Sequence, residues 1–415
     1  MTTYEEIIQK FPVEVQSTVQ TVWNSLSPTE KENLLKMVDG VPSEASLVKI
    51  LIRLSAAQLK QAFGQKSRVA IVGPANVGKS TLYNHFIHSK ADIAKVSPLP
   101  GTTRVNQEAD AGLFAVIDTP GADAVGEVGE KEKNEALSAG KEADFLIILF
   151  DAIQGIKKTE KEIFDDLAGL GKPYIVALNK IDLVKGDQEG VLRLVANNLG
   201  LEPGQVIPVT AKTGKNIDQL LIGIAIAEPA IVSALGRALP EYRWQLAWRS
   251  IVSASSISGG IALLPLPLLD FGPLIVNQAI MVMGIARIYN YDINLERARE
   301  LVATFGIGFL GRMIFQELSK LGGIPGWVLS AAIASSTTVV MGYAAVQWFE
   351  KGEKLSSESL NRLTHKVTDQ MLDSLKKLGK KRPSQKRFQE AVVESLKEIT
   401  IEDTPIPEVS AEAEK

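Results

Sequence analysis

The chain has 415 residues, a length typical of two or three domains, and a formal net charge of −3 at pH 7. This charge balance does not favour a general nucleic-acid-binding protein, and the lack of cysteine excludes disulfides, thiol catalysis and thiolate metal sites. With only three histidines, a histidine-rich metal centre is not favoured either. The first residues include acidic side chains and no long apolar run, so we expect no secretory signal and a cytoplasmic protein.

Residues 1–64 are polar and have the periodicity of helices. The stretch SEASLVKILIRLSAAQLKQAF repeats its apolar side chains at helical spacing, and Gly64 is placed to end that helix. We therefore expect an N-terminal helical segment that packs against the next domain.

Residues 65–230 alternate short apolar runs with amphipathic stretches. The runs are RVAIVG, LFAVID, FLIILFD, PYIVALN and VIPVT. Such runs between helical stretches predict an α/β domain with a mainly parallel sheet and helices on both faces. In sheets of this kind, ligands bind at the C-terminal ends of the strands.

The stretch GPANVGKS at 73–80 has the spacing of a P-loop between a strand and a helix. Gly73 and Gly78 allow backbone conformations in which successive N–H groups can point at phosphate oxygens. Lys79 brings a positive charge to the β- and γ-phosphates, and the Ser80 hydroxyl can ligate Mg²⁺. The start of the helix adds favourable partial charge for an anion.

Further motifs follow the later strands. In DTPG at 118–121, Asp118 can hold Mg²⁺ through water, and the Gly121 N–H can approach the γ-phosphate. In NKID, the Asp182 carboxylate can accept from both the N1–H and the exocyclic amine of guanine, a donor pair that adenine lacks. In VIPVTAK, a backbone N–H of Ala211 or Lys212 can meet the guanine carbonyl. Together these motifs favour GTP over ATP.

The segments GPANVGKSTL, PGTTR, DTPG, NKID and TAKTGKNIDQLL resemble the motifs of the Era/TrmE-like family of translation-factor-class GTPases. The resemblance covers roughly residues 66–228. It implies hydrolysis of GTP to GDP and phosphate by a switch in which GTP orders two loops and hydrolysis releases them.

The resemblance also assigns roles to residues. Lys79, Thr103 and Gly121 would act in catalysis, with Thr102 as the other candidate for the threonine that ligates Mg²⁺ in the GTP state. Ser80, Thr103 and Asp118 would serve the Mg²⁺ ion. The expected nucleotide-binding residues are Gly73, Asn76, Val77, Gly78, Lys79, Ser80, Thr81, Asp118, Gly121, Asn179, Lys180, Asp182, Ala211 and Lys212.

The chain departs from the family in two loops that bear on hydrolysis. Val105 stands where the family usually has an acidic residue, and the P-loop proline is displaced to Pro74. Ala122 follows the DxxG glycine, where Ras-like GTPases use a glutamine to orient the attacking water. We therefore expect slow intrinsic hydrolysis that is stimulated by K⁺, by self-association or by a partner. Asn76 either helps to hold the K⁺, as in family members that use potassium, or stabilises the loop.

Residues 231–350 are apolar and poor in charge. The stretch GGIALLPLPLLDFGPL and the order of domains resemble certain bacterial Era-like GTPases that carry an uncharacterised apolar helical domain. Pro265, Pro267 and Pro273 divide the first half into pieces too short to span a bilayer, whereas the segment from Ile324 to Phe349 is long enough. The pattern fits either membrane association or a packed, soluble all-α domain.

Residues 351–402 are predicted to form a charged helical segment, and 403–415 an acidic, disordered tail. The basic cluster at 376–387 could meet anionic lipid headgroups or RNA phosphates, or form a solvated helix end.

Three functions are open on this basis. The first is a GTPase switch at the cytoplasmic face of a membrane, attached peripherally or integrally, with lipids as partners. The second is a ribosome- or RNA-associated GTPase, against which the C-terminal region offers no GxxG-bearing RNA-binding domain. The third is a dynamin-like remodeller that forms a homodimer or oligomer in the GTP state.

Overall fold

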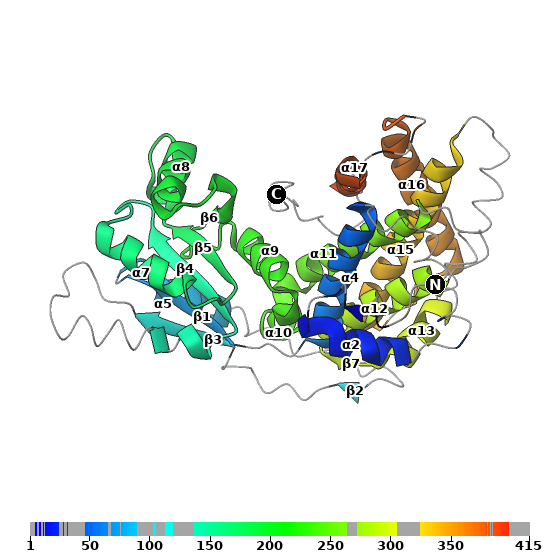
Figure 1. Cartoon of the computed structure of the whole chain (residues 1–415), viewed down its shortest axis with the longest axis horizontal. Helices are drawn as coiled ribbons and strands as arrows, with labels where there is room; N and C mark the ends of the chain where they lie inside the picture. Colours follow the sequence, from blue (N-terminus) through cyan, green and yellow to red (C-terminus); the bar gives the residue numbers. More distant parts are fainter. Residues whose placement is uncertain are drawn as a thin grey trace. The chain divides into compact units, whose positions relative to one another are not determined.

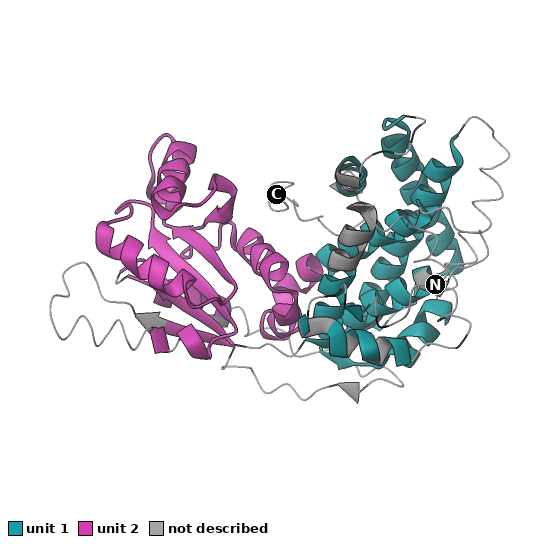
Figure 2. Ribbon diagram, in the orientation of Figure 1, with its two compact units in different colours: residues 1–64, 95–105, 247–411 teal, residues 65–94, 106–246, 412–415 magenta. Residues whose placement is uncertain are grey.

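The computed structural model describes residues 5, 8–9, 11, 13–24, 28, 31, 46–64, 68–74, 76–88, 103–104, 113–118, 137–138, 140–263, 272–304, 324–352, 354–379, 381, 383 and 385–397. The chain divides into two compact units (Figure 2). Unit 1 comprises Met1–Gly64, Lys95–Val105 and Ala247–Ala411, and unit 2 comprises Gln65–Ala94, Asn106–Leu246 and Glu412–Lys415. The predicted tail lies outside the described residues, and the predicted domain boundaries stay predictions.

Unit 2 is built on a five-stranded parallel sheet with the order β3-β1-β4-β5-β6. The strands are β1 (Val69–Gly73), β3 (Phe114–Asp118), β4 (Phe145–Asp151), β5 (Tyr174–Asn179) and β6 (Val206–Pro208). Each corresponds to one of the five apolar runs in the sequence. β1 and β4 are buried along their whole length, as the lack of alternation in their sequences predicts.

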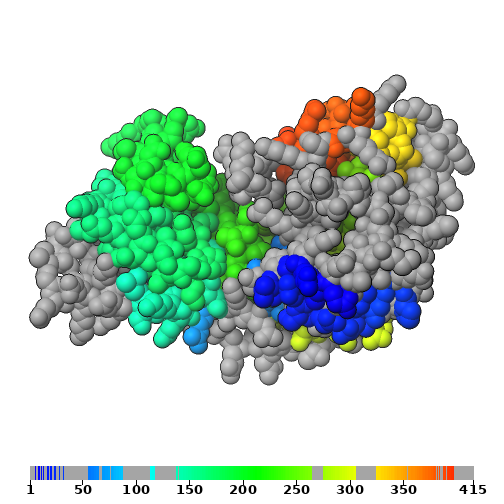
Figure 3. Space-filling view, in the orientation of Figure 1, coloured from blue at the N-terminus to red at the C-terminus, as the bar shows by residue number. Residues whose placement is uncertain are grey.

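Helices cover both faces of this sheet, which confirms the predicted fold class (Figure 1). On one face, α7 (Lys158–Ala168) and α8 (Gln188–Leu199) contribute buried side chains to a core with β1, β4, β5 and β6. The outer surfaces of these two helices are visible in Figure 3. On the other face, α5 (Lys79–His88) stacks Phe86 on Phe114 of β3 with 4.4 Å between ring centroids. There α9 (Ile217–Ala227) places Gly223 against Ile175 and Ile207.

Short elements lie between β5 and β6 and between α9 and the helix that opens the C-terminal region. They are the 3₁₀ helices η1 (Ile181–Leu183), η2 (Pro203–Gln205), η3 (Pro229–Ile231) and η4 (Pro240–Tyr242), and the helix α10 (Val232–Ala238). The next helix, α11 (Arg243–Ala262), begins in unit 2 and continues into unit 1.

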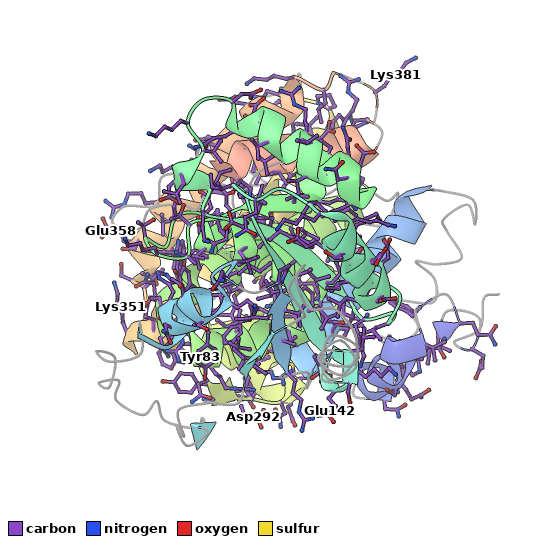
Figure 4. The ribbon with its side chains drawn as sticks, turned by 90° about the vertical axis from the view of Figure 1, so that its left-hand side faces the viewer. Tyr83, Glu142, Asp292, Lys351, Glu358 and Lys381 are labelled. Atoms are coloured by element: carbon purple, nitrogen blue, oxygen red, sulfur yellow. The ribbon has the colours of Figure 1, made fainter. Side chains whose placement is uncertain are left out.

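Unit 1 is helical, as expected for the N-terminal and C-terminal segments. Its further helices are α2 (Val13–Asn24), α4 (Ser46–Phe63), α12 (Gly272–Ile288), α13 (Leu295–Thr304), α15 (Gly326–Lys351), α16 (Ser357–Lys376) and α17 (Gln385–Lys397). A two-stranded antiparallel sheet joins β2 (Thr103–Arg104) to β7 (Tyr291–Asp292). Asp292, labelled in Figure 4, is exposed. The prolines at 265 and 267, between α11 and α12, lie outside the described residues.

The helix α15 lies in the interior of unit 1. It has 26 residues and a mean hydropathy of 1.5 over its most apolar stretch, of which 89% is buried. Length and composition alone would let it cross a membrane, and it is the one single helix among the described residues that meets this test. Close packing against α11 requires small residues: a Cβ added to Gly342 would lie 2.4 Å from Ile251 Cγ1.

Candidate functional site

The loop between β1 and α5 has the conformation that its glycines predict. A Cβ on Gly73 would lie 2.2 Å from the carbonyl oxygen of Leu149, so the neighbouring strand leaves no room for a side chain. Gly78 has φ +98°, and its added Cβ would meet the Asn179 side chain at 2.3 Å. Asn76 also has a positive φ, 64°, and is exposed at the tip of the turn. The loop therefore depends on residues that tolerate left-handed backbone conformations.

Lys79 lies at the first position of α5 and is only 4% exposed. Its Nζ donates to the carbonyl oxygens of Gly73 at 2.8 Å and Pro74 at 2.6 Å. These bonds hold the ammonium group against the beginning of the loop. Val77 is buried beneath the loop, while Ser80 and Thr81 are exposed in the first turn of the helix.

Asn179, at the end of β5, connects this loop to the last loop of the site. Its Nδ2 donates to the carbonyl oxygen of Val77 at 2.8 Å, and its Oδ1 accepts from the Ala211 N–H at 2.9 Å. The side chain is 3% exposed, so both bonds are shielded from water. One side chain thus fixes the expected phosphate end of the site relative to the expected guanine end.

Lys180 makes a second connection and reveals a residue that the motifs did not single out. Its Nζ donates to the Asn76 carbonyl oxygen and to Asp151 Oδ2, both at 2.7 Å. Asp151 is the last residue of β4 and is 4% exposed, and its Oδ1 also accepts from the Ile153 N–H at 2.8 Å. The signal was available, because the run FLIILFD ends in a carboxylate at the ligand-binding edge of the sheet.

Asp182 follows in η1 with an exposed side chain. Its Oδ1 accepts from Thr210 Oγ1 at 3.1 Å, which orients the carboxylate. The bond from Thr210 does not involve Oδ2. Ala211 is buried and Lys212 exposed in the turn that follows. This arrangement can present a carboxylate and backbone N–H groups to a planar base.

The backbone register places Asp118 at the same edge of the sheet. As the last residue of β3, it is paired with Gly73 of β1. Ser80 and Asp118 carry oxygen groups of the kind that Mg²⁺ prefers, and their role as Mg²⁺ ligands stays a prediction. Within the described ranges, no group of three His, Asp or Glu side chains could hold a metal ion.

The other residues with a predicted part in hydrolysis lie either in unit 1 or outside the described residues. Thr103 belongs to β2 and pairs with Asp292 of β7 in unit 1. Gly121 and Ala122 lie outside the described residues, as does Thr102. The catalytic roles given to Thr103 and Gly121 stay predictions, as does the effect of Ala122.

Two protein families match the chain. Residues 68–180 match the family described as 50S ribosome-binding GTPase, and residues 231–377 match a domain of unknown function, DUF697. The first match contains the P-loop and ends at Lys180. The second begins in η3 and ends just beyond α16.

Similar proteins include GTPase Era of Aquifex aeolicus, which is 34% identical over 170 aligned positions in an alignment that covers 37% of this chain and 54% of that protein. GTPase Der of Pseudomonas putida is 38% identical over 159 residues, 37% of this chain and 31% of that protein. The chain thus spans between a third and about half of these relatives. A crystal structure of Era in complex with MgGDPNP and 16S ribosomal RNA aligns at 24% identity and a TM-score of 0.31, over 47% of this chain and 68% of that one. The segment at 68–180 is therefore a GTPase domain of the Era/Der type, and a domain of uncharacterised function follows it.

Proposed function

We propose that the protein is a molecular switch that binds GTP and hydrolyses it to GDP and phosphate. The observation that carries this proposal is the double hydrogen bond of Asn179, which joins the P-loop at Val77 to the guanine loop at Ala211. Phosphate and base would then be held by one connected set of loops rather than by separate sites.

The proposed chemistry assigns a task to each loop. Lys79 and the N-terminus of α5 stabilise phosphate charge, while Asp182 accepts hydrogen bonds from guanine. Ser80, Asp118 and Thr103 are the residues that would hold Mg²⁺, which neutralises charge on the phosphates when bound. No side chain is assigned as general base, so positioning and electrostatic stabilisation account for catalysis. We expect a slow basal rate that K⁺ at Asn76, self-association or a partner raises.

The position of β2 supports a route for the switch. Thr103, the proposed Mg²⁺ ligand, is paired through its backbone with Asp292, which lies within the DUF697 match. If Thr103 binds Mg²⁺ in the GTP state, β2 must move with it. The backbone pairing of β2 with β7 would therefore differ between the GTP and GDP states. Hydrogen exchange at Tyr291 and Asp292 should therefore differ between GDP and a non-hydrolysable GTP analogue, and identical exchange would contradict this route.

The nucleotide specificity is tested by equilibrium titration with fluorescent GDP and ADP. We expect the chain to bind GDP and not ADP, and Asp182→Ala to lose most of the GDP affinity because the guanine donors then lack their acceptor. Asp187→Ala, an exposed aspartate at the start of α8, is the control. Equal affinity of the wild-type protein for GDP and ADP would refute the proposal.

We further propose that the switch acts at the cytoplasmic face of a membrane as a peripheral protein. The burial of α15 favours this over a spanning helix, because insertion would require unit 1 to open. Exposed basic residues around the end of α16 and the start of α17 provide an attachment surface for anionic headgroups: Lys376, Lys377, Lys381 and Arg387.

Fractionation of cells tests this attachment. Release from membranes by high salt is expected, whereas retention through both salt and carbonate would indicate an integral anchor. The second candidate function is association with ribosomes, which the description of the matched GTPase family favours. Co-sedimentation with ribosomes instead of membranes would support that function.

A further inference from the structure

His85 lies on the same helix as the P-loop lysine but faces the guanine loop. Its half-buried ring is adjacent to Gly214, where an added Cβ would lie 2.6 Å from His85 Cε1 and 2.9 Å from Nε2. Gly214 has φ +79° and closes the turn that follows the predicted base-binding residues, since its N–H donates to the Thr210 carbonyl oxygen at 2.9 Å. The Cε1–Nε2 edge of the imidazole therefore lies against this turn.

Tyr242 contacts the same histidine from the start of the DUF697 region. Its hydroxyl lies 3.5 Å from His85 Nε2, the long end of a hydrogen bond. Burial, followed by the charges of Glu241 and Asp218, raises the pKa of Tyr242 to about 12, so the hydroxyl keeps its proton at physiological pH and can donate to the ring.

The residues next to Tyr242 fix its position. Tyr242 ends η4, and α11 begins at the next residue. Arg243 is 8% exposed, and its Nε donates to the Gly236 carbonyl oxygen at 2.8 Å, which ties the first turn of α11 back to α10. We call the turn at residues 210–214 the guanine turn. A movement of this turn would displace His85, and the contact between His85 and Tyr242 would pass the displacement to α11.

We infer that His85 and Tyr242 are a positioning pair for the guanine nucleotide. His85 fixes the position of the guanine turn relative to α5, and Tyr242 links His85 to α11. The inference rests on the proposed GTP-binding function. Neither side chain is assigned a contact with nucleotide, so their effect is on the position of the turn and hence on affinity. At the other end of this turn, Ala211 donates to Asn179, which also bonds to the P-loop at Val77.

The first test uses His85→Ala, Tyr242→Phe and the double variant, with titration of fluorescent GDP and thermal melting of the nucleotide-free proteins. An ordinary hydrogen bond corresponds to about two- to tenfold in Kd, and the loss of this long one should fall near the lower end of that range. We expect such a rise in each single variant, no further rise in the double variant, and unchanged melting temperatures. His85→Gln, which keeps a polar side chain, should restore much of the affinity. Tyr83→Phe is the matched control on the same helix, and Tyr83 is labelled in Figure 4.

The second test uses the space at Gly214. Gly214→Ala should weaken GDP binding, and the loss should be smaller when His85→Ala removes the ring that the new methyl group meets. Equal losses in both backgrounds, or wild-type affinity in His85→Ala and Tyr242→Phe, would overturn the inference while the proposed function stands. Failure of the wild-type protein to bind GDP would overturn both.

Discussion

The two units place their polar side chains in different surroundings. In unit 2, Asn179, Lys180 and Asp182 follow one strand and lie at an edge of the sheet where loops meet. In unit 1, polar side chains lie inside the helical packing: Ser255 and Ser335 each donate a hydroxyl to the carbonyl oxygen of the other at 3.1 Å. The polar side chains of unit 2 hold loops in place for a ligand, whereas those of unit 1 form hydrogen bonds between helices.

A single cluster shows how far unit 1 satisfies its own polar groups. Asn277 Nδ2 donates to Ser258 Oγ and to the Ala254 carbonyl oxygen, each at 2.8 Å. Thr338 Oγ1 is hydrogen-bonded to Ser258 Oγ at 2.7 Å and accepts from Gln278 Nε2 at 3.2 Å. These bonds cross α11, α12 and α15 in the buried interior. Because a buried polar group without a partner is costly, such a network specifies one packing of the three helices.

Removing the connection in unit 2 should have the largest effect. Asn179→Ala leaves the buried Val77 carbonyl and the buried Ala211 N–H without their partner. We expect a loss of about 2–5 kcal/mol in the free energy of unfolding of unit 2. Binding of GDP should fall below detection, because the P-loop and guanine loop lose their common support. Chemical unfolding and titration with fluorescent GDP measure the two effects.

Asn198→Ala is the control for this variant, since Asn198 is an exposed asparagine on α8. It should leave stability and affinity unchanged. Wild-type GDP affinity in Asn179→Ala would show that the P-loop and the guanine loop keep their positions without Asn179. The polar side chains of unit 2 would then not be needed to hold the loops for a ligand.

The matched change in unit 1 should destabilise without affecting the nucleotide. Asn277→Ala removes two buried hydrogen bonds, but Ser258 keeps its bond with Thr338, so we expect a smaller loss of about 1–3 kcal/mol. Tryptophan fluorescence reports mainly on this unit, which contains Trp23, Trp248, Trp327 and Trp348, whereas Trp244 lies in unit 2.

Two further measurements show whether Asn277→Ala affects unit 1 alone. The Kd for GDP should stay at the wild-type value in Asn277→Ala, and Glu358→Ala, an exposed change on α16, should alter neither property. A large drop in GDP affinity in Asn277→Ala would mean that the buried network supports the nucleotide site. The polar groups of unit 1 would then serve more than helix packing.

Much of unit 2 could be predicted because local sequence and position in the sheet agree. β-branched runs give buried parallel strands, and each polar motif except PGTTR begins where a run ends. Chain order alone therefore places Asn179 and Asp182. Asp151 was missed because it belongs to no spaced motif: its role depends on Lys180 crossing from the next strand. The run FLIILFD marks Asp151 as a carboxylate at a strand end, but its pairing with Lys180 is a property of the folded sheet.

Unit 1 was harder to predict, because hydropathy measures composition and not the surroundings of a side chain. In α15 the hydroxyls of Thr337 and Thr338 donate to the carbonyl oxygens of Ile333 and Ala334 at 2.7 and 2.8 Å. A lipid-facing helix can make the same bonds, so the sequence could not distinguish a membrane span from a core helix. Similarly, the pairing of Thr103 with Asp292 joins segments far apart in the chain, which no local pattern could indicate.

The smallest expected effect concerns Tyr242, the residue that precedes α11. Its pKa is about 12 in the folded protein against an ordinary value of 10.0, mainly because burial disfavours the charged form. The folded state therefore holds this proton more tightly than the unfolded chain does. The stabilisation is fully present below pH 10 and is lost as the pH rises from 10 towards 12.

Absorbance at alkaline pH resolves this group from the other tyrosines. The difference between the wild-type and Tyr242→Phe titrations of the phenolate band should have its midpoint near 12, and the variant should lose less stability between pH 10 and 12. A midpoint near 10 would mean that solvent reaches the hydroxyl. Tyr242 would then be an exposed residue of the connection, and the contact with His85 would not persist in solution. A midpoint near 12 would mean that the Tyr242 hydroxyl, close to the start of the DUF697 match, is shielded from water within unit 2.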